Sequence, residues 1–441
     1  GATEEQLDFV TLFGSSRDGW MSFEHDIRTK DIKPLLQAVI DVIPEAPYKA
    51  GAVQMGITSL DFNAFQGRIA IGRVFRGDLE ENKDYYICKK NDVMKKVRVK
   101  ELFVFEGLGK AKVSKVRSGD LCAVVGIDDF DIGDSIVDLN EPEALPRIEV
   151  DEPTMSMLFT INNSPFFGKE GKYVTSRHLR ERLYKELEKN LALRVEDGES
   201  EDKFNVFGRG VLHLSVLIET MRREGYEIQV GKPQVIIKEI DGVKCEPVEI
   251  LVVDVPEVSS GKVIELITQR KGLLKVMEPK GDVQHLEFEI PSRGIIGLRN
   301  NVLTATAGEA VMTHRFHQFE PFKGDLPARL KGSMVSMEMG QALPFAIDRL
   351  QDRGKFFVDP GEQVYIGQVL GEHSRDNDLE INVIKGKKLT NMRASGSDEN
   401  MKIAPKIQFS LEEAMEYIRD DEYLEVTPLS LRMRKINFRP S

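Results

Sequence analysis

Lysine and arginine side chains gather at three places in this chain, and their spacing is its clearest chemical signal. The first place holds six cations within twelve residues, opposed only by Asp92: Lys89, Lys90, Lys95, Lys96, Arg98 and Lys100. Short β-type runs surround these cations, so we predict a hairpin with a basic surface. Such a hairpin either contacts a polyanion or is an ordinary solvated turn, and both interpretations stay open.

The second cluster occupies the stretch from Lys385 to Lys402, which contains almost no large apolar residue. Its other cations, Lys387, Lys388 and Arg393, lie among Gly, Ser, Asn and Thr. A loop of this length cannot bury itself, and cations with amide and hydroxyl donors suit a phosphate backbone. We therefore expect a polyanion-binding loop that is mobile in the isolated protein and ordered on RNA. A passive flexible linker is the alternative.

The third cluster lies at the end of the chain, where Arg432, Arg434, Lys435 and Arg439 predict a basic terminal strand. The whole chain has 61 Lys and Arg against 72 Asp and Glu, a net charge of −11. That balance argues against a generic cationic nucleic-acid coat. Basic clusters separated within an acidic chain instead predict docking on RNA in one orientation.

No self-contained active site is visible in the sequence. It has no GxxxxGK[ST] phosphate loop, no GxSxG, no HExxH and no grouped Cys and His residues. His314 and His317 are close, but three residues apart in a predicted strand they point to opposite faces, and no third ligand is evident. The isolated Cys88, Cys122 and Cys245 are interpreted as buried small hydrophobes in a reducing compartment. We expect neither a metal ion nor a catalytic constellation.

Length and composition set the class of protein. The chain has 441 residues and a mass of 49.8 kDa, which predicts two to four domains of about 100–200 residues each. No apolar run approaches the ~20 residues of a membrane span, and the N-terminus has no signal-peptide pattern. A cytoplasmic protein that does not contact membranes is the default expectation.

The first ~48 residues resemble the end of a domain whose beginning is missing. We predict a buried strand at Phe9–Phe13 and then a helix with Asp31 as its N-cap, Pro34 in its first turn and Pro44 after its end. Residues ~50–148 hold short strands separated by turn residues, which predicts a β-barrel or sandwich.

Residues ~150–320 contain a repeated pattern, because the order β-α-β-β-α-β is predicted twice in tandem. The second helix of the second copy is predicted to run through SRGIIGLRNNVLTATAG. A further unit follows, with β-type runs and two helices, one near LPFAIDRLQDRG. The other is capped by Ser410, with Glu413 at the capping-box position.

Four segments carry a resemblance to a known family: QFSLEEAMEYI, KGKKLTNMRASGSDE, PSRGIIGLRNNVLTATAG and FGRGVLHLSVLIETMRREGYEIQVGKPQVI. Together they closely resemble the TypA/BipA family of bacterial translational GTPases, over essentially the whole chain. No domain is inserted between Val230 and Val248, which separates the chain from elongation factor G, and the loop at Lys385–Lys402 separates it from LepA.

The resemblance implies an α+β multidomain fold with a translation-factor domain 2 type β-barrel, two ferredoxin-like split βαβ domains and a β-rich C-terminal domain unique to the family. The expected boundaries are 1–48 for the C-terminal remnant of a GTP-binding domain, 49–148 for the barrel, 149–235 and 236–323 for the ferredoxin-like domains, and 324–441 for the family-specific C-terminal RNA-binding domain.

The resemblance also implies a GTPase that uses GTP and Mg in the full-length protein. GSSRDG matches the family's final guanine-contacting loop, so Gly14, Ser15 and Ser16 are the expected remnant of the nucleotide site. The phosphate loop, the switches, the catalytic histidine and the Asn-Lys-x-Asp motif are absent from this sequence. We therefore expect no catalytic residue, no hydrolysis and no bound cofactor in this chain alone.

As partners, the resemblance implies the 70S ribosome and the 50S subunit, through rRNA and ribosomal proteins, and tRNA, with a monomeric protein in the factor site. It further implies roles in 50S-subunit assembly and in growth under stress such as cold. The RNA-binding role falls on residues of the basic loop and of a second loop near the stalk base: Lys385, Lys387, Lys388, Asn391, Arg393, Lys402, Arg270 and Lys271.

Two other functions are weighed against the hypothesis of a ribosome-binding GTPase portion. A stand-alone RNA-binding assembly protein without GTPase activity is the alternative, and the half-domain at the N-terminus argues against it. A metabolic enzyme with a pocket between domains is disfavoured by the missing catalytic constellation.

Overall fold

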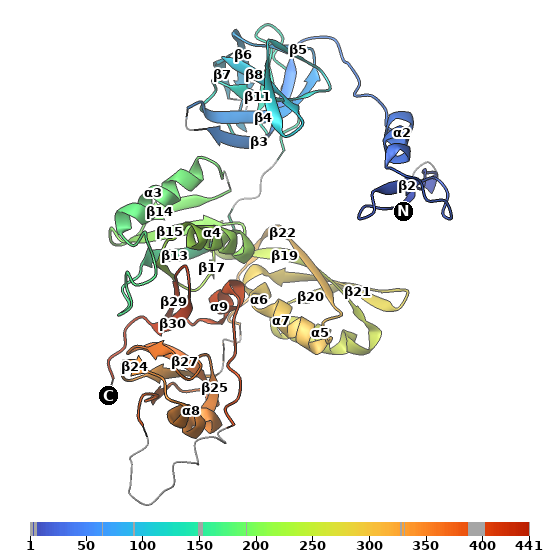
Figure 1. Cartoon of the computed structure of the whole chain (residues 1–441). Coiled ribbons are helices and arrows are strands. Elements are labelled where there is room, and N and C mark those ends of the chain that lie inside the picture. The colour runs from blue at the N-terminus through green and yellow to red at the C-terminus, as the bar shows by residue number, and fades with distance from the viewer. Residues whose placement is uncertain are drawn as a thin grey trace, which may run out of the picture. The chain divides into compact units, whose positions relative to one another are not determined.

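The computed structural model describes the chain except residues 1–2, 4–6, 64, 91–92, 149–152, 191, 327–328, 330, 387–401 and 441. Its described residues form two compact units, residues 1–149 and residues 150–441 (Figure 1).

The first unit begins with a small hairpin, β1 (Phe13–Ser15) paired to β2 (Trp20–Ser22), followed by helix α2 (Lys33–Val42). The predicted strand at Phe9–Phe13 is wrong, because only Phe13 lies in a strand and Phe9 is 70% exposed. An apolar run needs a neighbouring strand to become one, and in the described residues only β2 pairs here, with Phe13–Ser15.

The predicted cap of helix α2 is also wrong. The N-cap residue is Ile32, and the Asp31 carboxylate accepts a hydrogen bond from the Lys33 N–H at 3.0 Å. Asp31 therefore lies one position before the N-cap residue, and its carboxylate still accepts from a free amide of the first turn. Pro34 lies in that turn, as expected.

The rest of the first unit is an eight-stranded antiparallel sheet in the order β7-β6-β12-β3-β4-β11-β8-β9. Its strands are β3 (Gln54–Asn63), β4 (Gly67–Arg76), β6 (Lys83–Cys88), β7 (Met94–Val99), β8 (Glu101–Glu106), β9 (Gly109–Val113), β11 (Leu121–Val125) and β12 (Ser135–Val137), and β5 (Asp78–Glu80) pairs separately with β10 (Lys115–Arg117). Alternate residues such as Met55, Ile57, Tyr85 and Ile87 are fully buried in one core. Closure of this sheet into the expected barrel stays a prediction.

The second unit opens with the first predicted β-α-β-β-α-β segment. Its elements are β13 (Met155–Ile161), α3 (Ser176–Leu187), β14 (Arg194–Asp197), β15 (Lys203–Gly208), α4 (Val211–Glu224) and β16 (Ile228–Val230), and the strand order is β14-β15-β13-β16. Helix α3 starts at Thr175, whose hydroxyl accepts from the His178 N–H, and Leu179 and Leu183 are its buried stripe. Helix α4 ends at Gly225, where φ is 96°.

The second β-α-β-β-α-β segment is separate from the first sheet. It contains β19 (Val243–Pro256), α5 (Glu257–Gln269), β20 (Leu273–Lys280), β21 (Val283–Pro291), α6 (Ser292–Ile295), α7 (Leu298–Ala305) and β22 (Val311–Pro321), in the strand order β20-β21-β19-β22 with β18 (Lys238–Ile240) on β19. The single helix predicted after β21 is wrong, because it is broken into α6 and α7. Gly297 lies at the break with a φ of 71°, which a residue with a Cβ rarely adopts.

The C-terminal residues continue the sheet of the first segment. Strand β16 pairs with β29 (Glu422–Val426), and the order then runs through β30 (Leu431–Lys435), β27 (Gln368–His373), β23 (Ser333–Ser336) and β28 (Leu379–Ile381). The remaining elements are β17 (Gln234–Val235), β24 (Gly340–Gln341), β25 (Gly354–Phe356), β26 (Gln363–Val364), α8 (Pro344–Leu350) and α9 (Leu411–Tyr417). The predicted capping box of Ser410 and Glu413 is confirmed at the start of α9.

A buried polar network fixes the junction between these two parts of the sheet. The Glu425 carboxylate accepts hydrogen bonds from Asn162 Nδ2 at 2.9 Å, Ser164 Oγ at 3.0 Å, Tyr365 Oη at 2.6 Å and Arg432 Nη1 at 3.3 Å. The Glu425, Asn162 and Tyr365 side chains are at most 1% exposed. Burial and the neighbouring Glu425 charge raise the pKa of Tyr365 well above its ordinary value, so its hydroxyl stays a donor.

We predict that Glu425→Gln destabilises the second unit by about 3 kcal/mol, because an amide oxygen cannot accept from all four donors and buried donors are then left unsatisfied. A lower denaturant midpoint, followed by circular dichroism, is the expected result. The control is Glu101→Gln, which alters an exposed ion pair with Lys112 at 2.8 Å and should leave the midpoint almost unchanged. Equal midpoints for the two variants would contradict the prediction.

Candidate nucleic-acid interface

The predicted remnant of a guanine site lies on the β1–β2 hairpin. Gly14 and Ser15 end β1, and Ser16 begins the turn to β2. The Ser15 hydroxyl donates to Asp18 Oδ2 at 3.1 Å and accepts from the Asp18 N–H at 3.2 Å. This hydroxyl therefore has both its partners within its own turn.

Of the basic hairpin predicted at Lys89–Lys100, Lys89 and Lys90 follow β6, Lys95, Lys96 and Arg98 lie in β7, and Lys100 follows β7. The fold brings two carboxylates to its cations, Asp84 from β6 itself and Asp129 from a segment further along the chain. Asp129 pairs with Lys89 at 2.5 Å and with Lys95 at 3.1 Å. Asp84 pairs with Lys96 at 3.0 Å and with Arg98 at 3.5 Å.

These pairs neutralise part of the positive charge of the hairpin, while Lys90 and Lys100 stay exposed without an ion pair to a described residue. The hydrogen bond from Lys89, followed by that from Lys95, lowers the pKa of Asp129 below its ordinary value. Asp129 is 40 residues from Lys89 in sequence, so inspection of the cluster alone could not reveal it. The arrangement favours the solvated-turn interpretation of the hairpin over polyanion contact.

The predicted basic terminal strand is β30, and the pairing of its cations inside the protein argues against an RNA surface there, whereas Arg439 lies beyond the strand and is exposed. Arg432 pairs with Glu170 as well as with Glu425. Lys435 is 5% exposed and pairs with Asp378 at 2.6 Å, Asp421 at 2.8 Å and Glu422 at 3.0 Å. Burial opposes its charge, but the three carboxylates together raise the pKa of Lys435 above its ordinary value. Arg434 donates to Asn163 Oδ1 at 2.7 Å.

The two candidate RNA contacts near helix α5 have different surroundings. Arg270 is half-buried and donates to the carbonyl oxygens of Gly294 at 3.1 Å and Ile296 at 2.6 Å. Burial lowers the pKa of Arg270, although the nearby Glu416 opposes the shift. Its guanidinium therefore holds the backbone at the α6–α7 break. Lys271 is exposed, with a φ of 65°.

The basic loop is described only at its two stems. Lys385 and Lys402 are exposed, and neither forms an ion pair with any described residue. Lys387, Lys388, Asn391 and Arg393 lie outside the described residues, so their RNA-binding role and the expected ordering of the loop stay predictions.

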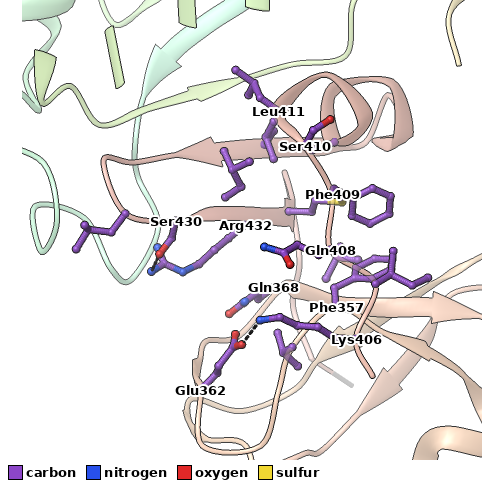
Figure 2. A pocket seen from close by; sticks show the side chains of 18 of the residues that line it. Phe357, Glu362, Gln368, Lys406, Gln408, Phe409, Ser410, Leu411, Ser430 and Arg432 are labelled. Atoms are coloured by element: carbon purple, nitrogen blue, oxygen red, sulfur yellow. Dashed lines mark hydrogen bonds and ion pairs between the residues drawn. The ribbon is translucent and has the colours of Figure 1, made fainter. Parts of the chain in front are cut away.

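A groove of about 890 Å³ lies where the first β-α-β-β-α-β segment meets the C-terminal residues (Figure 2). Its apolar wall includes Phe409, Leu411 and Met433, and Figure 2 shows Lys406 directed at Glu362, with which it forms an ion pair. Arg432 in the same groove is engaged by Glu170 and Glu425, as described above. These two cations already have carboxylate partners, whereas Lys169, which also lines the groove, lies over the Phe166 ring and forms no ion pair with a described residue.

The described residues contain no group of three His, Cys, Asp or Glu side chains that could hold a metal ion. His314 is instead paired with Glu249, at 2.5 Å between Nδ1 and Oε2. The three cysteines are buried, as predicted. No helix in the described part of the chain is both long and apolar enough to span a bilayer.

Three models of protein families match this chain: "TypA/BipA C-terminal domain" over residues 331–440, "Elongation factor G C-terminus" over 243–330 and "Elongation factor Tu domain 2" over 67–137. The chain is 46% identical over 439 residues to the "Large ribosomal subunit assembly factor BipA" of Synechocystis sp., covering 99% of this chain and 73% of that protein. The proteins of the same name from Salmonella typhimurium and Bacillus subtilis are 46% and 44% identical, each over 98% of this chain and over 72% and 71% of their own lengths.

The His314–Glu249 pair predicts a pH-dependent contribution to stability. The Glu249 hydrogen bond, opposed by burial, raises the pKa of His314 above its ordinary value. When folding raises the pKa of a group, that group contributes its full stabilisation at pH values below the pKa that it has in the unfolded chain. The contribution is lost as the pH rises through the pKa that the group has in the folded protein. The melting temperature of the wild type should therefore exceed that of His314→Gln at about pH 6, and the difference should shrink by about pH 9. A difference that does not change with pH would contradict this assignment.

Proposed function

The chain belongs to the TypA/BipA family, and on that basis we propose that it is the ribosome-binding effector portion of a GTP-binding translation and 50S-subunit assembly factor. The observation that carries the proposal is the identity of 44–46% to proteins named large ribosomal subunit assembly factor, over almost the whole chain. Matches to elongation factor models over residues 67–137 and 243–330 support a translational role.

The proposed partners are the 70S ribosome and the 50S subunit, through rRNA and ribosomal proteins, and tRNA. The protein acts as a monomer in the cytoplasm, docks in the ribosomal factor site and serves growth under stress such as cold. The proposed domain boundaries after residues 48, 148, 235 and 323, with a barrel at 49–148, belong to the same proposal. Its RNA contact is the loop from Lys385 to Lys402, and Lys271 adds a contact near the stalk base.

GTP and Mg belong to the full-length family member in this proposal. The residues of this chain do not fit the nucleotide, because its sequence has no phosphate loop and the Ser15 hydroxyl is engaged within its own turn. No step of GTP hydrolysis is therefore assigned to these residues.

The loop proposal predicts that a quadruple alanine variant binds 50S subunits more weakly than the wild type. The four substituted residues are Lys385, Lys387, Lys388 and Arg393. Each lost phosphate contact should also lower the log-log salt slope by roughly 0.7–0.9. Pelleting of subunits over a salt series measures both quantities. The matched control changes four exposed cations of the first β-α-β-β-α-β segment, Arg177, Lys185, Lys189 and Arg194, and should bind like the wild type. Equal affinity and slope for the loop variant and the wild type would overturn the loop assignment.

We also expect this chain to bind guanine nucleotide negligibly, because the phosphates have no partners here. Calorimetric titration with a non-hydrolysable GTP analogue should give no heat of binding. A micromolar dissociation constant would show that a nucleotide site is present.

A further inference from the structure

Helix α8 lies between the two stems of the basic loop. At its start, the Leu343 N–H donates to the Val383 carbonyl oxygen at 2.9 Å, two residues before Lys385. At its end, Gln351 Nε2 donates to the Lys402 carbonyl oxygen at 3.2 Å, and Gln351 Oε1 accepts from the Ala404 N–H at 3.2 Å. The helix and the 3₁₀ turn Gln351–Arg353 that follows therefore connect the point where the chain leaves for the loop to the point where it returns.

The inner face of this helix is held firmly. Ala346 is 5% and Ile347 1% exposed, and Ile347 belongs to one core with Ile381, Val383 and Phe356. The Arg353 carbonyl oxygen accepts from the Ser374 N–H at 2.8 Å, which fixes the turn to the neighbouring strand connection. The outer face is therefore presented in a defined orientation.

The exposed side of α8, the 3₁₀ turn and the following strand β25 carry three cations that no carboxylate of the described chain neutralises. Arg349, Arg353 and Lys355 are exposed, and none of them forms an ion pair with any described residue. Arg349 lies in the last turn of α8, Arg353 ends the 3₁₀ turn and Lys355 lies in β25, so the three cations fall within seven residues of ordered backbone. Asp352 is the exposed carboxylate among them, whereas Asp348 accepts from Gln351 at 3.0 Å.

The contrast with the other basic clusters is informative. Four of the six hairpin cations pair with Asp84 or Asp129, and Arg432 and Lys435 of β30 pair with buried carboxylates. Lys90 and Lys100 of the hairpin are exposed and form no ion pair with a described residue, but they lie in the other unit, away from the stems of the basic loop in the sequence. Arg349, Arg353 and Lys355 have no such partners in the described chain, and they adjoin two further unpaired cations at the stems, Lys385 and Lys402.

We propose that Arg349, Arg353 and Lys355, the α8 surface, bind the phosphate backbone of the same RNA that the basic loop contacts. Arginine donors match phosphate oxygens in a fixed fork, and the ordered backbone of α8, the 3₁₀ turn and β25 places these cations without the cost of ordering a loop. The inference rests on the proposed function, because it takes ribosomal RNA as the polyanion. It assigns part of the RNA contact to an ordered surface beside the loop.

The test is Arg349→Ala, Arg353→Ala and Lys355→Ala together, in the whole chain, assayed by pelleting with 50S subunits over a salt series. Three lost phosphate contacts should lower the log-log slope by roughly two to three. The variant Arg349→Lys with Arg353→Lys keeps the charges and should retain most of the slope. The matched control is Arg177→Ala with Lys185→Ala and Lys189→Ala, and an unchanged melting temperature shows that each variant is folded.

The outcomes separate this inference from the proposed function. A loss of slope in the α8 variant but not in the control supports it. If the α8 variant keeps the wild-type salt slope and the loop variant loses slope, only the assignment of the α8 surface is overturned. If neither the α8 variant nor the loop variant loses salt slope, the ribosome proposal is overturned as well. The assay is repeated with protein-free 23S rRNA, and a loss seen only with intact subunits would assign the surface to a protein partner and overturn the RNA assignment.

Discussion

The carboxylate of Glu425 is the point on which the second unit depends. It is fully buried and accepts hydrogen bonds from Asn162 and Ser164 of the first β-α-β-β-α-β segment, and from Tyr365 and Arg432 of the C-terminal residues. A buried charge in this position is tolerated only when every partner is in place, so it fixes the register of β16 against β29. The two parts then share one sheet and one apolar core, and the C-terminal residues have a defined platform.

The pairing of cations inside the protein also determines which cations can face RNA. Lys435 and Arg432 neutralise buried carboxylates, and Arg270 holds backbone carbonyls at the α6–α7 break. The cations that remain available in the described chain include Lys385 and Lys402 at the loop stems, and those of the α8 surface. In a chain with a net charge of −11, repulsion from the remaining surface would favour the orientation in which these cations meet the polyanion.

Local patterns in the sequence predicted helices and strands where the signal lies within a few residues. The wrong predictions fall where the outcome depends on a partner that is far away in the sequence. The spacing of Ser410 and Glu413 predicted the start of α9, because a capping box acts within a few residues. The basic character of β30 was misread because Glu170 lies 262 residues from Arg432 in the sequence. The apolar run at Phe9–Phe13 was misread for a similar reason, since a strand requires a partner that its own residues do not specify.

The central claim is that the lysines of this chain divide into a structural set and an RNA-facing set. It is tested most directly by labelling the lysine amines chemically, with and without 50S subunits, and reading each site by mass spectrometry. The account predicts that Lys355, Lys385 and Lys402 react in the free chain and are protected on the subunit, whereas Lys435 is unreactive in both states and Lys185 is reactive in both. Equal reactivity of Lys355, Lys385 and Lys402 with and without subunits, or ready labelling of Lys435 in the free chain, would contradict it.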